Sequence, residues 1–181
     1  MSMNGAAAQL EIMQKTQSKK SSKSRAVQEE IVFNQWATFK VNNELFAIDV
    51  MQVKEVLRFS EITPVPGSSS YIRGIINLRG NVVTVIDTRL LFSLDARKID
   101  DDTRIIVVEY NEQEVVGMVV DSVDEVVNIP QNHIERAPSV ASDDSERRFV
   151  QGVSYYENQL IILLDLAKML ASITPVIEEN Q

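Results

Sequence analysis

The stretch Gly74–Phe92 (GIINLRGNVVTVIDTRLLF) decides the fold, because a related stretch recurs near the end of the chain. The second copy is Gly152–Leu170 (GVSYYENQLIILLDLAKML), and the two align without a gap, with Asp87 opposite Asp165. In each copy, two apolar runs of strand length flank a turn, and the aspartate precedes a short apolar segment. This order predicts a β-hairpin followed by a short helix that the aspartate caps.

A second pair of related stretches lies outside this one. Leu45–Leu57 (LFAIDVMQVKEVL) reappears 70 residues later as Val115–Val127 (VVGMVVDSVDEVV). The positions that recur are Val53, Glu55 and Val56, which return as Val123, Glu125 and Val126. The chain therefore contains two related β-rich units of about 70 residues each. Duplicated units that pack together create a groove between them, and this favours partner recognition over catalysis.

Composition limits the classes of protein to which the chain can belong. It has 181 residues, of which 44% are hydrophobic and 24% charged, with a net charge of −8 and no cysteine. Disulfides and thiolate metal sites are therefore excluded. The first 25 residues carry five basic groups and one acidic group, which leaves an acidic body that does not attract nucleic acid. No apolar run approaches the roughly 18 residues of a membrane span, so no direct membrane insertion is expected.

The pattern of apolar runs predicts an all-β protein with few short helices. Residues 1–30 are polar and Ser/Lys-rich and are predicted to be a disordered tail. Residues 31–174 are predicted to form two β-barrel units, at about 31–98 and 99–174, with the option that strands are shared between them. Residues 88–92 and 166–170 are the expected short helices. The other expected strands span residues 36–41, 45–48, 105–110, 114–120, 123–129 and 149–153.

The sequence offers little support for an enzyme. Asp87 and Asp165 occupy equivalent positions, and a pair of carboxylates raises the alternative of a small hydrolase. Because each precedes a short apolar segment, N-capping accounts for both. His133 is the only histidine and lies in no catalytic motif, and the run Asp100–Asp102 lacks the spacing of a calcium loop. We therefore expect no catalytic residue, no metal and no cofactor.

Glu55 and Arg79 are charged groups set among apolar residues. Glu55 lies between Val53 and Val56, and Arg79 lies in the turn of RGIINLRG. A charge left alone in a region of low dielectric is costly, so we expect the two side chains to pair or to face a partner. The simpler alternative is that both face solvent.

The segment Arg73–Gly80 (RGIINLRG), with NVVTVIDTRLLF after it, closely resembles the signature of bacterial chemotaxis coupling proteins of the CheW type. Phe39–Leu57 resembles the opening strands of that family. Ile62–Gly74 (ITPVPGSSSYIRG) resembles its proline loop, and Gly117–Ile129 resembles the core of its second unit. The resemblance covers Gln35–Leu170.

The resemblance implies an adaptor without enzymatic activity. The family has two SH3-like five-stranded β-barrels that enclose a third, shared apolar core. Its members couple the cytoplasmic tip of transmembrane chemoreceptors (methyl-accepting chemotaxis proteins) to a chemotaxis histidine kinase, whose regulatory domain they bind. The implied localisation is cytoplasmic, in receptor arrays joined through protein partners.

The resemblance also implies a receptor-binding site. A glutamate–arginine bridge of the family corresponds to Glu55 and Arg79, and an apolar groove position corresponds to Val53. The matching turn glycine is Gly74. Two apolar residues near these positions, Val50 and Ile76, complete the expected receptor-binding set.

Overall fold

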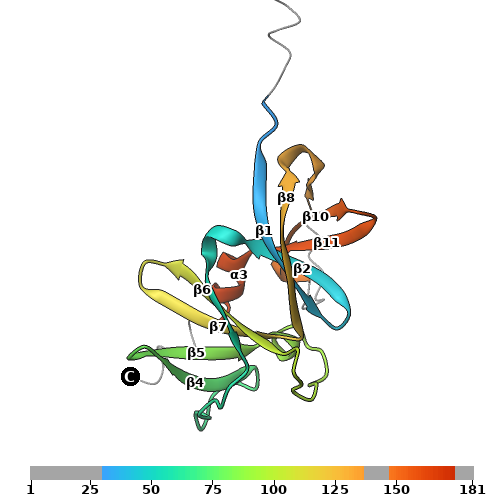
Figure 1. Ribbon diagram of the computed structural model, residues 1–181. Coiled ribbons are helices and arrows are strands. Elements are labelled where there is room, and N and C mark those ends of the chain that lie inside the picture. Colours follow the sequence, from blue (N-terminus) through green and yellow to red (C-terminus); the bar gives the residue numbers. More distant parts are fainter. Residues whose placement is uncertain (1–29, 137–146, 174–181) are drawn as a thin grey trace, which may run out of the picture. The chain divides into compact units, whose positions relative to one another are not determined.

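The computed structural model describes residues 30–136 and 147–173 of the chain (Figure 1). Met1–Val32 and Phe33–Gln181 are separate units, and the described strands and helices belong to the second. The predicted disordered tail, residues 1–30, lies outside the described residues except for Glu30.

The first sheet gathers strands from both ends of the unit. Its strand order is β8-β1-β2-β11-β10-β9, in which β11 runs parallel to β2 and the other pairs are antiparallel. Five of these strands are of ordinary length and β9 has two residues. The strands are β1 (Phe33–Val41), β2 (Glu44–Asp49), β8 (Ser122–Pro130), β9 (Glu135–Arg136), β10 (Val150–Tyr156) and β11 (Gln159–Leu164).

The second sheet is built from the middle of the unit. Its order is β3-β6-β7-β5-β4, with β5 parallel to β7. Its strands are β3 (Val53–Arg58), β4 (Ile72–Leu78), β5 (Asn81–Asp87), β6 (Arg104–Asn111) and β7 (Glu114–Val120). Two α-helices and three 3-10 turns complete the described structure: α2 (Thr88–Leu91), α3 (Leu166–Ala171), η1 (Val50–Gln52), η2 (Gln131–His133) and η3 (Arg147–Phe149).

The internal repeat appears as a reciprocal exchange of strands. β1 and β2 join β8–β11, whereas β6 and β7 join β3–β5, and the two strand orders match at five positions, with β9 as the additional strand of the first sheet. The sheets therefore do not follow the chain halves 31–98 and 99–174, because each half contributes strands to both sheets. The chain crosses from the first sheet to the second at η1 and returns at Asp121, between β7 and β8.

Three hydrophobic clusters hold the unit together, and they confirm the predicted all-β fold with a shared core. One cluster lies within the first sheet around Trp36 and another within the second around Val85. The largest joins both sheets and both helices, with Phe46, Met118 and Met169 all less than 2% exposed. Figure 1 shows the two groups of strands with α3 between them.

The predicted turns and caps are confirmed in detail. Asp87 accepts a hydrogen bond from the backbone N–H of Leu90 (3.3 Å), and Asp165 accepts one from the N–H of Lys168 (3.1 Å). The β4–β5 hairpin turns through Arg79 and Gly80, with φ of +50° and +86°. Asn81 opens β5 and pairs with Leu78.

The crossing at Asp121 is fixed by a network of charges. Its carboxylate, 10% exposed, accepts hydrogen bonds from Arg89 of α2 (2.9 Å) and from the backbone N–H of Asn42 in the β1–β2 turn (2.8 Å), and Arg97 lies 3.5 Å away. Burial raises the pKa of this carboxyl, but the hydrogen bonds and the arginine charges outweigh burial and hold the pKa below its usual value.

Gly74 occupies a position that no other residue fits. Its φ is +144°, and an added Cβ would overlap the backbone carbonyl of Thr63, which forms a β-bridge with Ile75. We expect Gly74→Ala to lower the free energy of unfolding by about 1–3 kcal/mol or more, since strain and a displaced bridge add. Thermal unfolding should show a melting temperature lower by several degrees.

The matched control for this prediction is Gly67→Ala. Gly67 also has a positive φ, +79°, but an added Cβ would meet nothing within 4 Å. Gly67→Ala should lower the free energy of unfolding by only about 1–2 kcal/mol, which is the cost of a left-handed backbone conformation for a residue with a Cβ. Equal losses at both positions would contradict the role assigned to the close approach of Thr63.

The lowered pKa of Asp121 makes the free energy of unfolding depend on pH. A carboxyl whose pKa is lower in the folded state adds stability above its unfolded pKa of about 4, and that stability is lost as the pH falls through the folded pKa. Asp121→Asn should therefore destabilise the protein by about 1.5–3 kcal/mol at pH 7. Denaturant titrations should show that the difference from wild type shrinks as the pH drops towards 3.

The matched control is Asp124→Asn. The carboxylate of Asp124 is 37% exposed and lies 3.9 Å from Lys40, as in an ordinary surface ion pair worth about 0–1 kcal/mol. A gap between wild type and Asp121→Asn that stays constant from pH 7 to pH 3 would contradict the linkage.

Candidate interaction site

The predicted contact between Glu55 and Arg79 is confirmed. A guanidinium nitrogen of Arg79 donates to Oε2 of Glu55 over 3.1 Å. Glu55 lies on β3, and Arg79 lies in the turn after β4. Since β3 and β4 are the two edges of the second sheet, the ion pair connects its edges. The Arg79 side chain is 78% exposed and that of Glu55 is 24% exposed, so solvent screens the pair.

Val50 and Val53 lie where the chain crosses between the sheets. Val53 is half-buried and packs against the central core. Val50, in η1, lines a pocket of about 650 Å³ together with Phe33 and Met51. Met51 is 86% exposed and Phe33 is 56% exposed, so this pocket carries an apolar surface in water. We call Phe33, Val50, Met51 and Val53 the crossover surface.

Gly74 and Ile76, the other two predicted site residues, are buried. Ile76 is 9% exposed and packs in the core of the second sheet, and Gly74 is covered by Thr63. A partner protein cannot contact Ile76 or Gly74 without displacing the residues that cover them. Their place in the structure is to hold β4, and through its turn Arg79, in position.

Sequence reasoning missed three exposed or half-exposed valines. Val56 is 44% exposed and Val126 is 54% exposed, and Val123 packs against the central core as Val53 does. The repeat was the signal that could have found them, because it pairs Val53 with Val123 and Val56 with Val126. Both edge strands, β3 and β8, therefore present the same pattern of valines.

The two aspartates of the hydrolase alternative do not form a common site. Asp87 lines a narrow pocket with Arg73, whose Nε donates to its Oδ2 over 3.0 Å. Asp165 lines a different pocket near Trp36. Each carboxylate also caps its own helix, so the geometry does not assemble a pair of acids around one substrate.

The described ranges hold neither a metal-binding cluster nor a membrane-spanning helix. Residues 30–136 and 147–173 contain no group of three or more His, Asp or Glu residues placed to hold a metal ion. Within the same ranges, no helix has the length and apolar character needed to cross a membrane.

Comparison with known proteins agrees with this architecture. Residues 35–174 match the model of the CheW-like domain. The chain belongs to the CheW-like family. It is 40% identical over 127 residues to the chemotaxis protein CheW of Bacillus subtilis, covering 70% of this chain and 80% of that protein. It is 31% identical over 139 residues to CheW of Thermotoga maritima, covering 76% of this chain and 87% of that protein.

A solved CheW structure supports the fold directly. The crystal structure of the scaffolding protein TtCheW from Thermoanaerobacter tengcongensis superposes with a TM-score of 0.70 at 35% sequence identity. The match covers 76% of this chain and 92% of that one. The CheW resemblance and the fold class predicted from the sequence are therefore confirmed.

The exposure of the Glu55–Arg79 pair predicts a small effect on stability. Glu55→Arg and Arg79→Glu should each lower the free energy of unfolding by about 0–1 kcal/mol. The double variant should recover part of that loss, because the reversed charges can pair again. Chemical denaturation of the four proteins in the cycle measures the coupling. A coupling energy near 3–5 kcal/mol would show a desolvated pair instead.

Proposed function

We propose that this protein is a non-enzymatic chemotaxis adaptor that couples the cytoplasmic tip of a chemoreceptor to a histidine kinase. The observation that carries the proposal is the exposed apolar crossover surface beside the Glu55–Arg79 pair, in a chain of the CheW-like family. Its relatives are named chemotaxis proteins and a scaffolding protein. An adaptor of this kind resides in the cytoplasm and reaches the membrane through its partners.

The crossover surface suits a helical partner. Met51 has a flexible side chain and Phe33 an aromatic one, and both are exposed. Val53, which lies near Met51 in the sequence, packs against the central core. The apolar face of a helix binds such a surface by burying side chains spaced three or four residues apart. A receptor tip made of a helical hairpin presents this kind of face.

The Glu55–Arg79 pair borders the receptor site as a positioning element. It ties β3, which carries Val53, to the hairpin turn at the other edge of the sheet. Ile76 and Gly74 belong to β4 of the same hairpin and fix its position, Ile76 through the core of the second sheet and Gly74 through its close approach to Thr63. Of the six proposed receptor-site residues, Val50 and Val53 then contact the receptor, and Glu55, Arg79, Gly74 and Ile76 hold the surface in shape.

The kinase regulatory domain is proposed to bind away from the crossover surface. That domain is related to the present fold, and related barrels are expected to associate through their ends. Receptor and kinase can then bind at the same time, as coupling requires.

Charge on the crossover surface should disrupt receptor binding. Val53→Asp removes an apolar contact worth about 1.5–3 kcal/mol when buried and places an unpaired carboxylate there, so receptor binding should weaken by at least roughly tenfold. Because Val53 is half-buried, Met51→Asp is the companion variant, since its 86% exposure leaves the fold unaffected. Titration with a purified receptor cytoplasmic fragment gives the affinity.

The control is Val82→Asp, an exposed valine of β5 that does not belong to the crossover surface. It should bind the receptor fragment like wild type. Kinase binding should survive in Met51→Asp and Val53→Asp. If Met51→Asp and Val53→Asp both retained receptor affinity, the receptor site would lie elsewhere.

A further inference from the structure

A cleft of about 830 Å³ lies on the second sheet. It is bounded by the β4–β5 turn, the β6–β7 turn and the end of α3. Its apolar wall includes Leu78, Val82, Val115 and Ile173. Ile173 belongs to the central core, so the cleft opens directly onto apolar packing. None of the four residues of the crossover surface lines it.

Val82 is the exposed apolar contact point of this cleft. It is 68% exposed, although most other valines of its sheet are buried. The parallel pairing of β5 with β7 begins at Thr84 and Val116, and Val82 and Glu114 each lie two residues before these positions. Both Val82 and Glu114 line the cleft, which therefore brings an apolar side chain and a carboxylate into one site.

The charges around the cleft are unbalanced. Four carboxylates and two cations line it. Both cations are already engaged, Lys54 with Glu109 at 3.6 Å and Arg79 with Glu55 at 3.1 Å. Glu112 and Glu114 form no ion pair with any residue of the described part of the chain. The cleft therefore joins an exposed apolar wall to two carboxylates that lack a cation.

We infer that this cleft is a second docking site, for a partner segment in which a lysine or arginine stands beside a large apolar side chain. The apolar side chain covers Val82, and the cation pairs with Glu112 and Glu114. Burial of the apolar group supplies affinity, and the charge complementarity selects basic over acidic segments. The site shares Glu55 and Arg79 with the proposed receptor site but includes no residue of the crossover surface.

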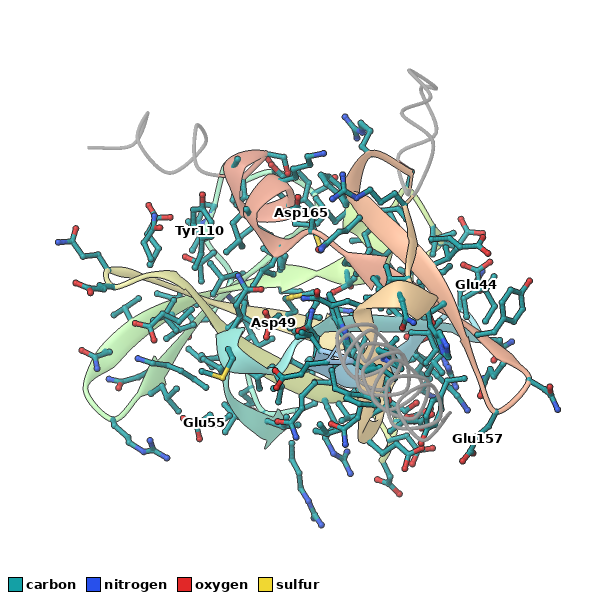
Figure 2. All side chains as sticks on the ribbon, turned by 90° about the horizontal axis from the view of Figure 1, so that it is seen from above. Glu44, Asp49, Glu55, Tyr110, Glu157 and Asp165 are labelled. Atoms are coloured by element: carbon teal, nitrogen blue, oxygen red, sulfur yellow. The ribbon has the colours of Figure 1, made fainter. Side chains whose placement is uncertain are left out.

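The repeat provides matched controls for a test. Glu44 is the repeat counterpart of Glu114 and is the first residue of β2, and Leu160 is the counterpart of Val82. Figure 2 shows Glu44 and Glu157 on the opposite side of the molecule from Glu55, which lines the cleft. Glu112→Lys with Glu114→Lys can therefore be compared with Glu44→Lys with Glu157→Lys, at the same net charge.

The probe is a fluorescein-labelled peptide of alternating leucine and lysine, measured against the full-length protein by fluorescence anisotropy. Peptides of alternating leucine and glutamate, and of alternating serine and lysine, test charge and apolarity separately. We expect the leucine–lysine peptide to bind most tightly and to shift the backbone amide NMR signals of Val82, Glu112 and Glu114. Glu112→Lys with Glu114→Lys should weaken binding at least roughly tenfold.

The remaining variants decide the outcome. Val82→Ser should weaken peptide binding several-fold, whereas Leu160→Ser, the Glu44/Glu157 double variant and Met51→Asp should not. Equal losses in both double variants would reduce the effect to general charge attraction and overturn the proposal. The proposal would also be overturned if the leucine–glutamate peptide bound as tightly as the leucine–lysine peptide. If sedimentation showed a dimer that the cleft variants dissociate, the occupant would be a second copy of the chain instead.

Discussion

Neither sheet of this protein can be completed by its own half of the chain, and the rest of the structure depends on that constraint. β1 and β2 obtain both of their outer neighbours, β8 and β11, from the second half of the unit. The exchange encloses the central core, because the strands that cross carry their apolar residues into it from both sides. Separating the two halves of the chain would therefore break backbone pairing within each sheet as well as hydrophobic contacts.

The two crossings are related by the repeat but differ in chemistry. Met51 and Asp121 are 70 residues apart and occupy corresponding positions. Asp121 is surrounded by Arg89, Arg97 and the N–H of Asn42, which fix one crossing with buried charge. Met51 has 86% of its surface exposed, so the other crossing presents an apolar side chain to solvent. Under the proposed function, the two copies of one element thus divide stability and recognition between them.

Much of this fold could be predicted from sequence, because its hairpins and caps are local. Asp87 and Asp165 cap helices through contacts three residues away, and the period of the apolar runs marked the strands. The exchange of strands could not be derived, since apolar periodicity does not specify a partner. The Glu55–Arg79 contact was predicted correctly, whereas the burial of Ile76 was missed because alternation alone does not reveal which face of β4 is covered.

The strand exchange has a consequence for synthesis on the ribosome. Thr38 and Glu125, which bond across β1 and β8, are separated by 87 residues, and β2 must await β11 near the end of the unit. Contacts between residues so distant in sequence close late and slowly. The first hairpin therefore emerges with its edges bare and stays so until β8 and β11 have been translated. In this interval those bare edges are open to pairing with other chains.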